Sequence, residues 1–343
     1  MKLNGSLIAE QTKWLLEPQN PSVRFWTLQN LLDMTQKDAE VIAARSDIMK
    51  SPPVKAILGA QQPRGWWVEE NNMYLPKYTA STHSLLILAE LGAEMTPAIE
   101  RGIEQIFRFQ RDSGHFLPEL PVTEKGRASI VKDGCCFDGN ILFFLIHFGL
   151  LDDPRTQRLL EFNVGYHDDE RGGWRCRSYP INPAGVFPAN CYMGAVKVLR
   201  ALSMISPQKR SKKVKAVIET EVENILGNGV NMYLRNPDGS RKEKIGWKKF
   251  GFPLFYQSDV LEVLDTLTRL GVRDKRMQPS IDLVLGAQQP EGHWLLDNTF
   301  NGKMWVDIEE KGEPSKWITL RAIRTLAWFN NETSCSRASA QLN

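Results

Sequence analysis

Three cysteines lie where predicted helices and loops meet, and their thiols could bind a metal. Cys136 opens the segment CFDGN, Cys176 follows a Gly-Gly-Trp sequence, and Cys191 opens the segment CYMGAVK. Thiolates are good ligands for Zn²⁺. The spacing matches no standard zinc signature, so two interpretations stay open. Either the three residues converge on a zinc ion, or they are small side chains that fill tight packing sites between helices.

Aromatic residues are unusually dense in two segments of the C-terminal half. Trp247, Phe255 and Tyr256 lie close together in the first segment, and Trp305 lies in the second. Such rings could line an apolar cavity, where their faces would stabilise a carbocation or shield a lipid tail. Aromatic side chains in arrays of helices also serve as packing residues, and this second interpretation stays open.

The elements that must position these residues are repeats. The nonapeptide GAQQPRGWW spans 59–67, and GAQQPEGHW spans 286–294. Weaker copies at 110–116 and 168–174 keep a Gly two residues before an aromatic residue. Gln or Asp can cap backbone groups where a helix ends, Gly accepts the positive φ of a tight exit, and the aromatic side chain folds back onto the helix just finished. We therefore interpret the motifs as structural staples of a repeat protein.

Apolar residues at helical spacing predict thirteen helices, and strand alternation is nearly absent. The predicted helices span 6–16, 21–33, 37–49, 53–62, 79–92, 96–111, 137–150, 154–167, 188–204, 211–226, 253–271, 275–289 and 315–330. Many of them end in Leu-Gly or Gly-Leu, and short turns join them in pairs. Long connections, at 63–78, 112–135, 169–187, 228–252 and 291–313, then return the chain. We expect these connections to cover one end of the array.

Repeated helical hairpins with Gln-Gly-Trp motifs resemble the prenyltransferase and squalene-cyclase repeat superfamily. The resemblance implies an all-α fold, an α/α toroid in which about six helical hairpins form inner and outer rings around a central cavity. It places the toroid at 51–330, with N-terminal helices from 1–50 packing on it and a polar, disordered tail at 331–343. The fold alone does not choose among cyclases, prenyltransferases and binding proteins, since all of them use it.

The decapeptide GRASIVKDGC, which ends at Cys135, resembles a segment of protein prenyltransferase catalytic subunits. The resemblance implies that Arg127, with Lys132 helping, binds an isoprenoid diphosphate, because a guanidinium pairs bidentately with its oxygens. It also implies that Asp133 and Cys135 bind zinc together with further thiolates. The sequence departs from the family at Ile130, where the family has lysine, and no histidine has a clear counterpart of the third zinc ligand.

A terpene cyclase of the squalene–hopene type is the alternative that the resemblance leaves open. Cyclases that start by protonation use a D-x-D-D motif, which this sequence lacks. Their acid would then be a different residue, and Asp133, Asp138 and Asp169 are the candidates. Cyclases that start by ionisation hold magnesium on aspartate-rich motifs, but the closest strings here are better interpreted as helix starts and caps. We therefore predict zinc in preference to magnesium. A noncatalytic toroid that binds a lipid or serves as a scaffold is the third hypothesis.

Composition excludes several other classes of protein. The 343 residues are 42% hydrophobic and 24% charged, which is enough to bury a large core, and the net charge of +3 is too small to indicate a nucleic-acid partner. No apolar run approaches the roughly eighteen residues that a membrane span requires. Five cysteines, an odd number, do not suggest a disulfide framework. We expect a cytoplasmic protein with an isoprenoid-like ligand, and the sequence indicates no partner subunit.

Overall fold

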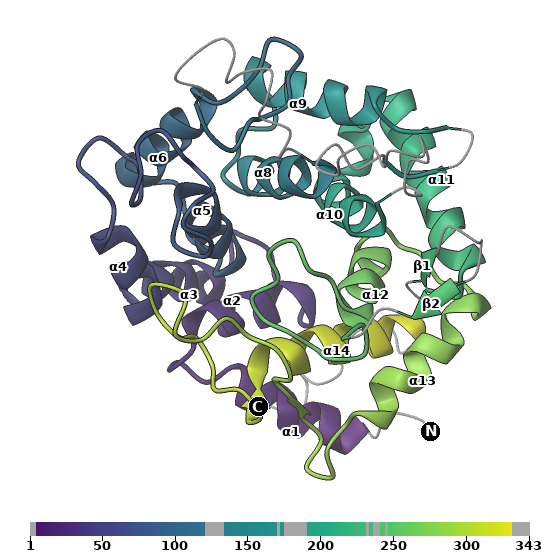
Figure 1. Cartoon of the computed structure of the whole chain (residues 1–343). Coiled ribbons are helices and arrows are strands. Elements are labelled where there is room, and N and C mark those ends of the chain that lie inside the picture. The colour runs from purple at the N-terminus through teal and green to yellow at the C-terminus, as the bar shows by residue number, and fades with distance from the viewer. Residues whose placement is uncertain are drawn as a thin grey trace.

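The computed structural model describes residues 5–120, 134–169, 172–174, 191–230, 233–235, 241–243 and 246–330. Helices make up nearly all of the regular structure in these ranges (Figure 1). They are α1 (Gly5–Leu15), α2 (Pro21–Asn30), α3 (Ala39–Lys50), α4 (Pro52–Gly59), α5 (Ser81–Glu90), α6 (Pro97–Phe107), α8 (Cys135–His147), α9 (Pro154–Gly165), α10 (Tyr192–Ser203), α11 (Lys212–Gly227), α12 (Val260–Arg269), α13 (Gln278–Gly286) and α14 (Lys316–Phe329). The short pieces are the 3₁₀ helices η1 (Pro207–Lys209) and η2 (Lys275–Met277), and the antiparallel strand pairs β1 (Tyr233–Arg235) with β2 (Arg241–Glu243) and β3 (Trp294–Leu295) with β4 (Pro314–Ser315).

The all-α prediction is confirmed, and every predicted helical range contains most or all of one of these helices. The largest difference concerns 253–271, where α12 begins only at Val260. Asp259 is the N-cap of this helix: its Oδ1 accepts a hydrogen bond from Glu262 N, and its Oδ2 accepts one from Gly251 N, both at 2.8 Å. Because the second bond folds the preceding backbone around the cap, the residues ahead of Asp259 form a loop.

Apart from α3 and α4, which are both outer helices, successive described helices alternate between two rings, so the fold is an α/α toroid (Figure 1). The inner ring contains α2, α5, α8, α10, α12 and α14, and the outer ring contains α1, α3, α4, α6, α9, α11 and α13. Every residue of α5 is buried, as are Val260–Leu267 of α12. A helix that is buried on all faces has neighbours on all of them, and the buried Glu90 of α5 and Glu262 of α12 find basic partners on other inner helices. This explains why these segments occupy the inner ring.

The two ends of the described chain meet and close the ring. α14 packs on both α1 and α2. Lys316 Nζ forms an ion pair with Glu17 at 2.7 Å and donates a hydrogen bond to Trp14 O at 2.8 Å. Gln11 Nε2 donates to Glu291 O at 2.8 Å. The first outer helix therefore completes the last repeat.

Two of the repeat motifs with a glutamine tie their own turn to a neighbouring element. Gln61 Nε2 donates to Gly65 O at 2.8 Å and, in the first turn of α6, to Ala98 O at 2.9 Å. Gln110 makes the same pair of bonds with its own turn and with α9. One side chain thus fixes the spacing of two successive hairpins.

The motif tryptophans fold back onto the helix just finished. Trp67 Nε1 donates to Ile57 O in α4, and Trp294 Nε1 donates to Val284 O in α13, both at 2.7 Å. The backbone N–H of Trp67 donates to Ser81 Oγ at the start of α5. These bonds confirm the interpretation of the motifs as structural staples.

The motif glycines cannot be replaced without moving the backbone. Gly65 has φ +112° and Gly114 has φ +101°. A Cβ at these positions would lie 2.5 Å from Arg101 O and 2.3 Å from Arg158 O, respectively. The motif therefore requires glycine both for its φ and for the close approach of the next outer helix.

Candidate functional site

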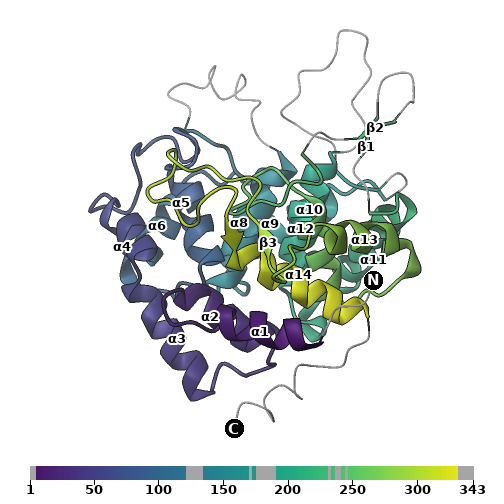
Figure 2. The same cartoon turned by 90° about the horizontal axis from the view of Figure 1, so that it is seen from below.

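Loops cover the end of the ring at which the inner helices α5, α8, α12 and α14 begin. This end faces the viewer in Figure 1 and lies at the top of Figure 2. The loops are tied to one another: Gly251 forms an isolated backbone bridge with Asn298, and Trp305 Nε1 donates to Thr79 O at 3.0 Å. Connections far apart in the sequence thus form one surface at this end.

Seven rings gather beneath and on this surface, and we call them the aromatic cluster. They belong to Tyr74, Tyr78, His83, Phe137, Phe255, Tyr256 and Phe300. Tyr78 is central, because its ring stacks on Phe300 at 4.4 Å between centroids and lies 5.2 Å from Phe255. Contacts of this geometry stabilise aromatic groups beyond the burial of their area.

The tyrosine hydroxyls form the polar part of the aromatic cluster. Tyr78 Oη lies 3.3 Å from Tyr256 Oη, and burial together with this hydrogen bond raises the pKa of Tyr78 to about 12. Burial also raises the pKa of Tyr74, and the negative charges that Tyr256 and Cys136 would carry raise it further. The phenols of Tyr74 and Tyr78 are therefore neutral at physiological pH, and the thiol of Cys136 lies near Tyr74.

His83 is buried in the aromatic cluster. Its ring centroid lies 5.0 Å from those of Tyr74 and Phe255. Burial, followed by the nearby charge of Lys77, lowers the pKa of His83 to about 3. Its Nδ1 has no hydrogen-bond partner among the described residues. The imidazole is thus neutral, and it offers a ligand a polar atom in apolar surroundings.

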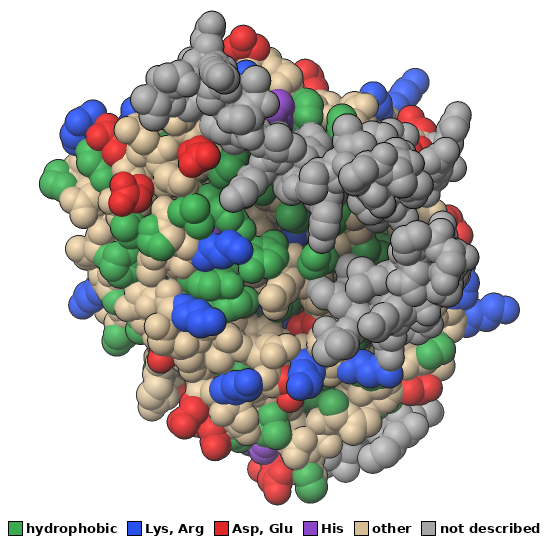
Figure 3. All heavy atoms as spheres, viewed as in Figure 1, with side chains coloured by type: hydrophobic (Ala, Val, Ile, Leu, Met, Phe, Trp, Pro, Cys, Tyr) green, Lys and Arg blue, Asp and Glu red, His purple; other side chains and the backbone are tan. Residues whose placement is uncertain are grey.

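Part of the aromatic cluster reaches the molecular surface. Tyr74, Tyr78, Tyr256 and Phe300 are half-buried, whereas Lys77 is exposed. Lys77 Nζ lies 5.3 Å from the ring centroid of Tyr256 and 5.9 Å from that of Tyr74. Figure 3 shows hydrophobic side chains gathered near the middle of this face, with Lys and Arg side chains beside them. The arrangement combines apolar rings, three hydroxyls and an ammonium group.

The structure brings together three of the four predicted aromatic ligand-binding residues. Phe255 and Tyr256 belong to the aromatic cluster, and Trp305 lies beside it, with its Nε1 also 3.1 Å from Ser84 Oγ. Trp247 is fully buried, packs edge-on against Tyr192 at 5.4 Å and is not part of the aromatic cluster.

Two of the predicted zinc ligands lie on either side of one glycine. A Cβ on Gly194 would lie 2.0 Å from Cys135 Sγ, and Gly194 N donates to Cys191 Sγ at 3.4 Å. None of the thiols of Cys135, Cys136 and Cys191 forms a disulfide, and among the described residues no three His, Cys, Asp or Glu side chains are grouped as a metal site. The described residues alone therefore do not provide a zinc site.

The other predicted residues of the diphosphate and zinc sites lie outside the described residues. They are Arg127, Lys132, Asp133 and Cys176.

The two described acids have different surroundings. Asp138 is fully buried in the first turn of α8, and its Oδ1 accepts a hydrogen bond from Phe116 N at 3.1 Å. It thereby stabilises a repeat motif in the same way as Ser81 does for Trp67. Asp169 is exposed, and its carboxylate lies 2.7 Å from His167 Nδ1.

Comparisons with known proteins identify structural similarity alone. No protein-family model matches the sequence, and no curated protein matches it. A protein from Actinoplanes has a TM-score of 0.45 and 12% identity, over 87% of this chain and 80% of that one. The R337A variant of the type II terpene cyclase MstE from Scytonema, in complex with geranylgeranyl dihydroxybenzoate, has a TM-score of 0.36 and 13% identity, over 83% and 97%. Dfg5 from Chaetomium thermophilum, in complex with glucosamine, has a TM-score of 0.42 and 12% identity, over 98% and 86%.

Similarities at this level say nothing of the substrate or reaction of this chain, and the resemblance to prenyltransferases has no counterpart among these matches. None of the helices in the described ranges is long and apolar enough to span a bilayer.

The sequence analysis missed Tyr74, Tyr78, Lys77 and the central place of His83. A signal was present in the segment NNMYLPKYT, where two tyrosines flank a lysine inside a long connection. Long connections with aromatic and basic residues often carry function.

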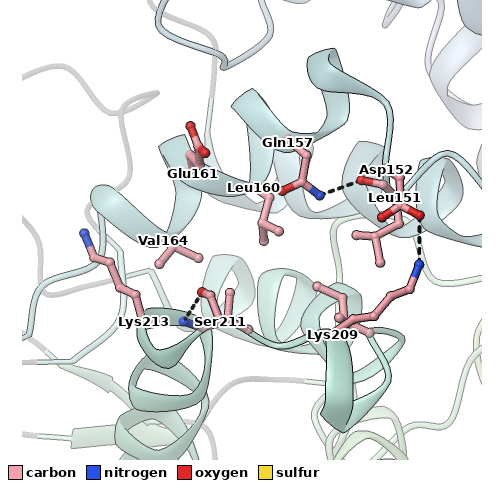
Figure 4. A pocket seen from close by; sticks show the side chains of 11 residues that line it. Leu151, Asp152, Gln157, Leu160, Glu161, Val164, Lys209, Ser211 and Lys213 are labelled. Atoms are coloured by element: carbon pink, nitrogen blue, oxygen red, sulfur yellow. Dashed lines mark hydrogen bonds and ion pairs between the residues drawn. The ribbon is translucent and has the colours of Figure 1, made fainter.

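A cavity of about 500 Å³ lies in the outer ring between α9 and α11 (Figure 4). Its apolar lining includes Leu160 and Val164, and Lys209 forms an ion pair with Asp152 at its edge, at 2.8 Å. The cavity shares no residue with the aromatic cluster, and the residues that line it include no aromatic side chain.

Proposed function

We propose that this protein binds an isoprenoid or a similar apolar chain on the aromatic cluster. The observation that carries the proposal is the convergence of half-buried rings from separate loops around the hydroxyl pair of Tyr78 and Tyr256. Ring faces bind apolar chains and stabilise positive charge. Lys77, at the edge of the rings, suits an anionic head group. The proposed ligand therefore has an apolar chain and a negatively charged end.

The finer proposal is prenyl transfer or another reaction of an isoprenoid diphosphate. Its support comes from the segment that resembles prenyltransferases, which ends at Cys135, the first residue of α8. Two residues later, Phe137 contacts Tyr74 of the aromatic cluster edge-on at 5.5 Å. Arg127, with Lys132, would bind the diphosphate while the rings hold the chain.

Binding of paired ligands tests both proposals. Farnesyl and geranylgeranyl diphosphates and the matching alcohols are titrated by calorimetry into the wild-type protein and into a Phe300→Ala variant. The variant loses the ring that stacks on Tyr78. Because one aromatic contact contributes roughly 1 kcal/mol or more, we expect Phe300→Ala to weaken diphosphate and alcohol alike by about tenfold.

Tyr166→Ala is the matched control. Tyr166 is also part-exposed and stacked, on Phe162 in the outer ring, but it lies outside the aromatic cluster. Its loss should leave both affinities unchanged. If none of the four ligands binds, or if the two variants lose equal affinity, the aromatic cluster is not the ligand site.

An Arg127→Ala variant separates the finer proposal from simple lipid binding. It should weaken the diphosphates and leave the alcohols unchanged, because only the former carry the anionic group. If the variant binds the diphosphates as tightly as the wild type does, Arg127 does not bind the diphosphate group. Tight binding without turnover of any ligand would favour the noncatalytic hypothesis.

Zinc is proposed for this site on the resemblance alone. Metal analysis of freshly purified, reduced protein tests it, with a Cys135→Ala, Cys136→Ala double variant and a Cys191→Ala variant for comparison. About one zinc per chain that disappears in the variants would support thiolate ligation. If the wild-type protein contains no zinc, the proposal is wrong and the cysteines are packing residues.

A further inference from the structure

The axis of the ring contains a network of charged side chains that are buried or half-buried, except for Arg269, which is exposed. Its basic members are Lys197, Arg200, Arg269, Arg321 and Arg324, and its acidic members are Glu90, Glu262 and Asp265. These residues come from the inner helices α5, α10, α12 and α14. We call them the axial network.

Each acid of the axial network is paired with basic groups. Lys197 Nζ lies 2.6 and 2.8 Å from the two carboxylate oxygens of Glu262. Glu90 pairs with Arg200 at 2.5 Å and with Arg321 at 3.2 Å. Burial raises the pKa of Glu90, but the charges of Arg200 and Arg321 outweigh this effect and lower it. Glu90 is therefore ionised.

Positive charge exceeds negative charge in the axial network. Asp265 pairs with both Arg324 and Arg269, so five basic groups face three acids. Transfer of a proton between Lys197 and Glu262 would not change this balance. Burial, together with the charge of Arg200, lowers the pKa of Arg324 to about 9. An excess of buried cations is costly unless an anion compensates it.

The axial network lines a cavity that contains unused hydrogen-bond donors. The cavity has a volume of about 30 Å³, and Arg200, Arg324 and Trp317 are among the residues that line it. Arg324 Nε and Trp317 Nε1 are buried without a hydrogen-bond partner in the described part of the chain. Arg200 Nη1 is likewise buried without a hydrogen bond there, although it lies 3.5 Å from the carboxylate of Glu262. The Trp317 residue is only 3% exposed. Buried donors of this kind normally have a partner.

We propose that this axial cavity binds a small inorganic anion, such as a halide. The three unused donors would hold the ion, and its charge would offset the excess of basic groups. The volume limits the occupant, because one water already needs about 10–15 Å³ of such space. An organic anion is therefore too large. This site is separate from the aromatic cluster and does not depend on the proposed function.

Bromide is the probe for the experiment because it scatters X-rays anomalously. Crystals of the full chain grown in sodium bromide should show an anomalous peak among Arg200, Arg324 and Trp317. In solution, the Tm is followed while sodium bromide replaces sodium gluconate at constant ionic strength, and sodium nitrate is titrated in parallel. A bound anion raises the Tm in a saturable manner.

Trp317→Phe tests the site without removing a charge. It keeps a ring for the stack on Phe252, whose centroid lies 4.1 Å away, but it removes one donor. We expect the anion affinity to fall about tenfold, as for the loss of a hydrogen bond to a charged group. Trp328→Phe is the control, since Trp328 Nε1 already donates to Val272 O. It should bind the anion as the wild type does.

Saturable stabilisation by bromide or nitrate that is weakened only in Trp317→Phe would establish the site. A cavity that contains ordered water and no anomalous peak would overturn the proposal. So would a rise in Tm that is linear in salt and equal in the three proteins, because it would reflect a general effect of the salt.

Discussion

The imidazole of His167 lies between two carboxylates, and its Nε2 is 2.8 Å from the buried Oε1 of Glu221 in α11. Its Nδ1 is bonded to the exposed Asp169. Glu221 Oε1 also accepts a hydrogen bond from Gly173 N, so the same carboxylate stabilises the repeat motif at 168–174. This arrangement makes His167 a titratable part of the scaffold.

Stability should depend on pH through His167. Burial lowers its pKa, but the bonds to Glu221 and Asp169 prevail, so that the pKa is raised above the ordinary value of 6.5. The native state then binds the proton more tightly than the unfolded state. This contribution is fully present below pH 6.5 and is lost as the pH rises through the native pKa. The free energy of unfolding in urea is measured for the wild type and for His167→Gln between pH 5.5 and about 9. It should decline with rising pH in the wild type only. The same pH dependence in both proteins would show that His167 is not responsible.

Gly114→Ala should be strongly destabilising. The new Cβ would meet Arg158 O at 2.3 Å, and φ is +101°. We expect a loss of roughly 3 kcal/mol in the free energy of unfolding, from backbone strain and displacement of α9. Gly59→Ala is the control, because nothing lies within 4 Å of its Cβ position. Thermal unfolding measures both, and similar Tm values for the two variants would show that the close approach is unimportant.

Lys197→Met should destabilise the protein by roughly 3–5 kcal/mol, because it removes one partner of a buried ion pair and leaves Glu262 with Arg200 alone, at 3.5 Å. Adding Glu262→Gln should recover part of the loss, since the unpaired charge is then gone. A double-mutant cycle by denaturant unfolding gives the coupling energy. Additive effects of the two substitutions would mean that the pair is not coupled.

Asp259→Ala should cost more than the loss of an ordinary helix cap. Asp259 caps α12 and also binds Gly251 N, whereas Ser211 caps α11 through Val214 N alone. We expect about 1 kcal/mol for Ser211→Ala and roughly twice that or more for Asp259→Ala, because Gly251 N is left buried and unpaired. Chemical denaturation of the two variants makes the comparison. Equal losses would show that the bond to Gly251 contributes nothing.

The sequence by itself determined the helices and the repeat motifs, because their signals are local, whereas the ring was an expectation from the resemblance to a repeat superfamily. Apolar periodicity predicts each helix. The residue types from Gln61 to Trp67 predict the geometry of the motif: the glutamine bonds to the turn, the glycine has a positive φ, and the tryptophan bonds to the preceding helix. These interactions span about ten residues, so residue types and spacing are enough to predict them.

Only the tertiary structure decided which residues meet. Tyr78 and Tyr256 are 178 positions apart, yet their hydroxyls pair because loops ahead of different inner helices lie at the same end of the ring. Glu90 and Arg321 meet at the axis only because the ring closes. Asp138 has the residue type of a catalytic acid, but burial against Phe116 N gives it a structural bond. Such outcomes depend on distances between helices, which residue types and local spacing do not encode.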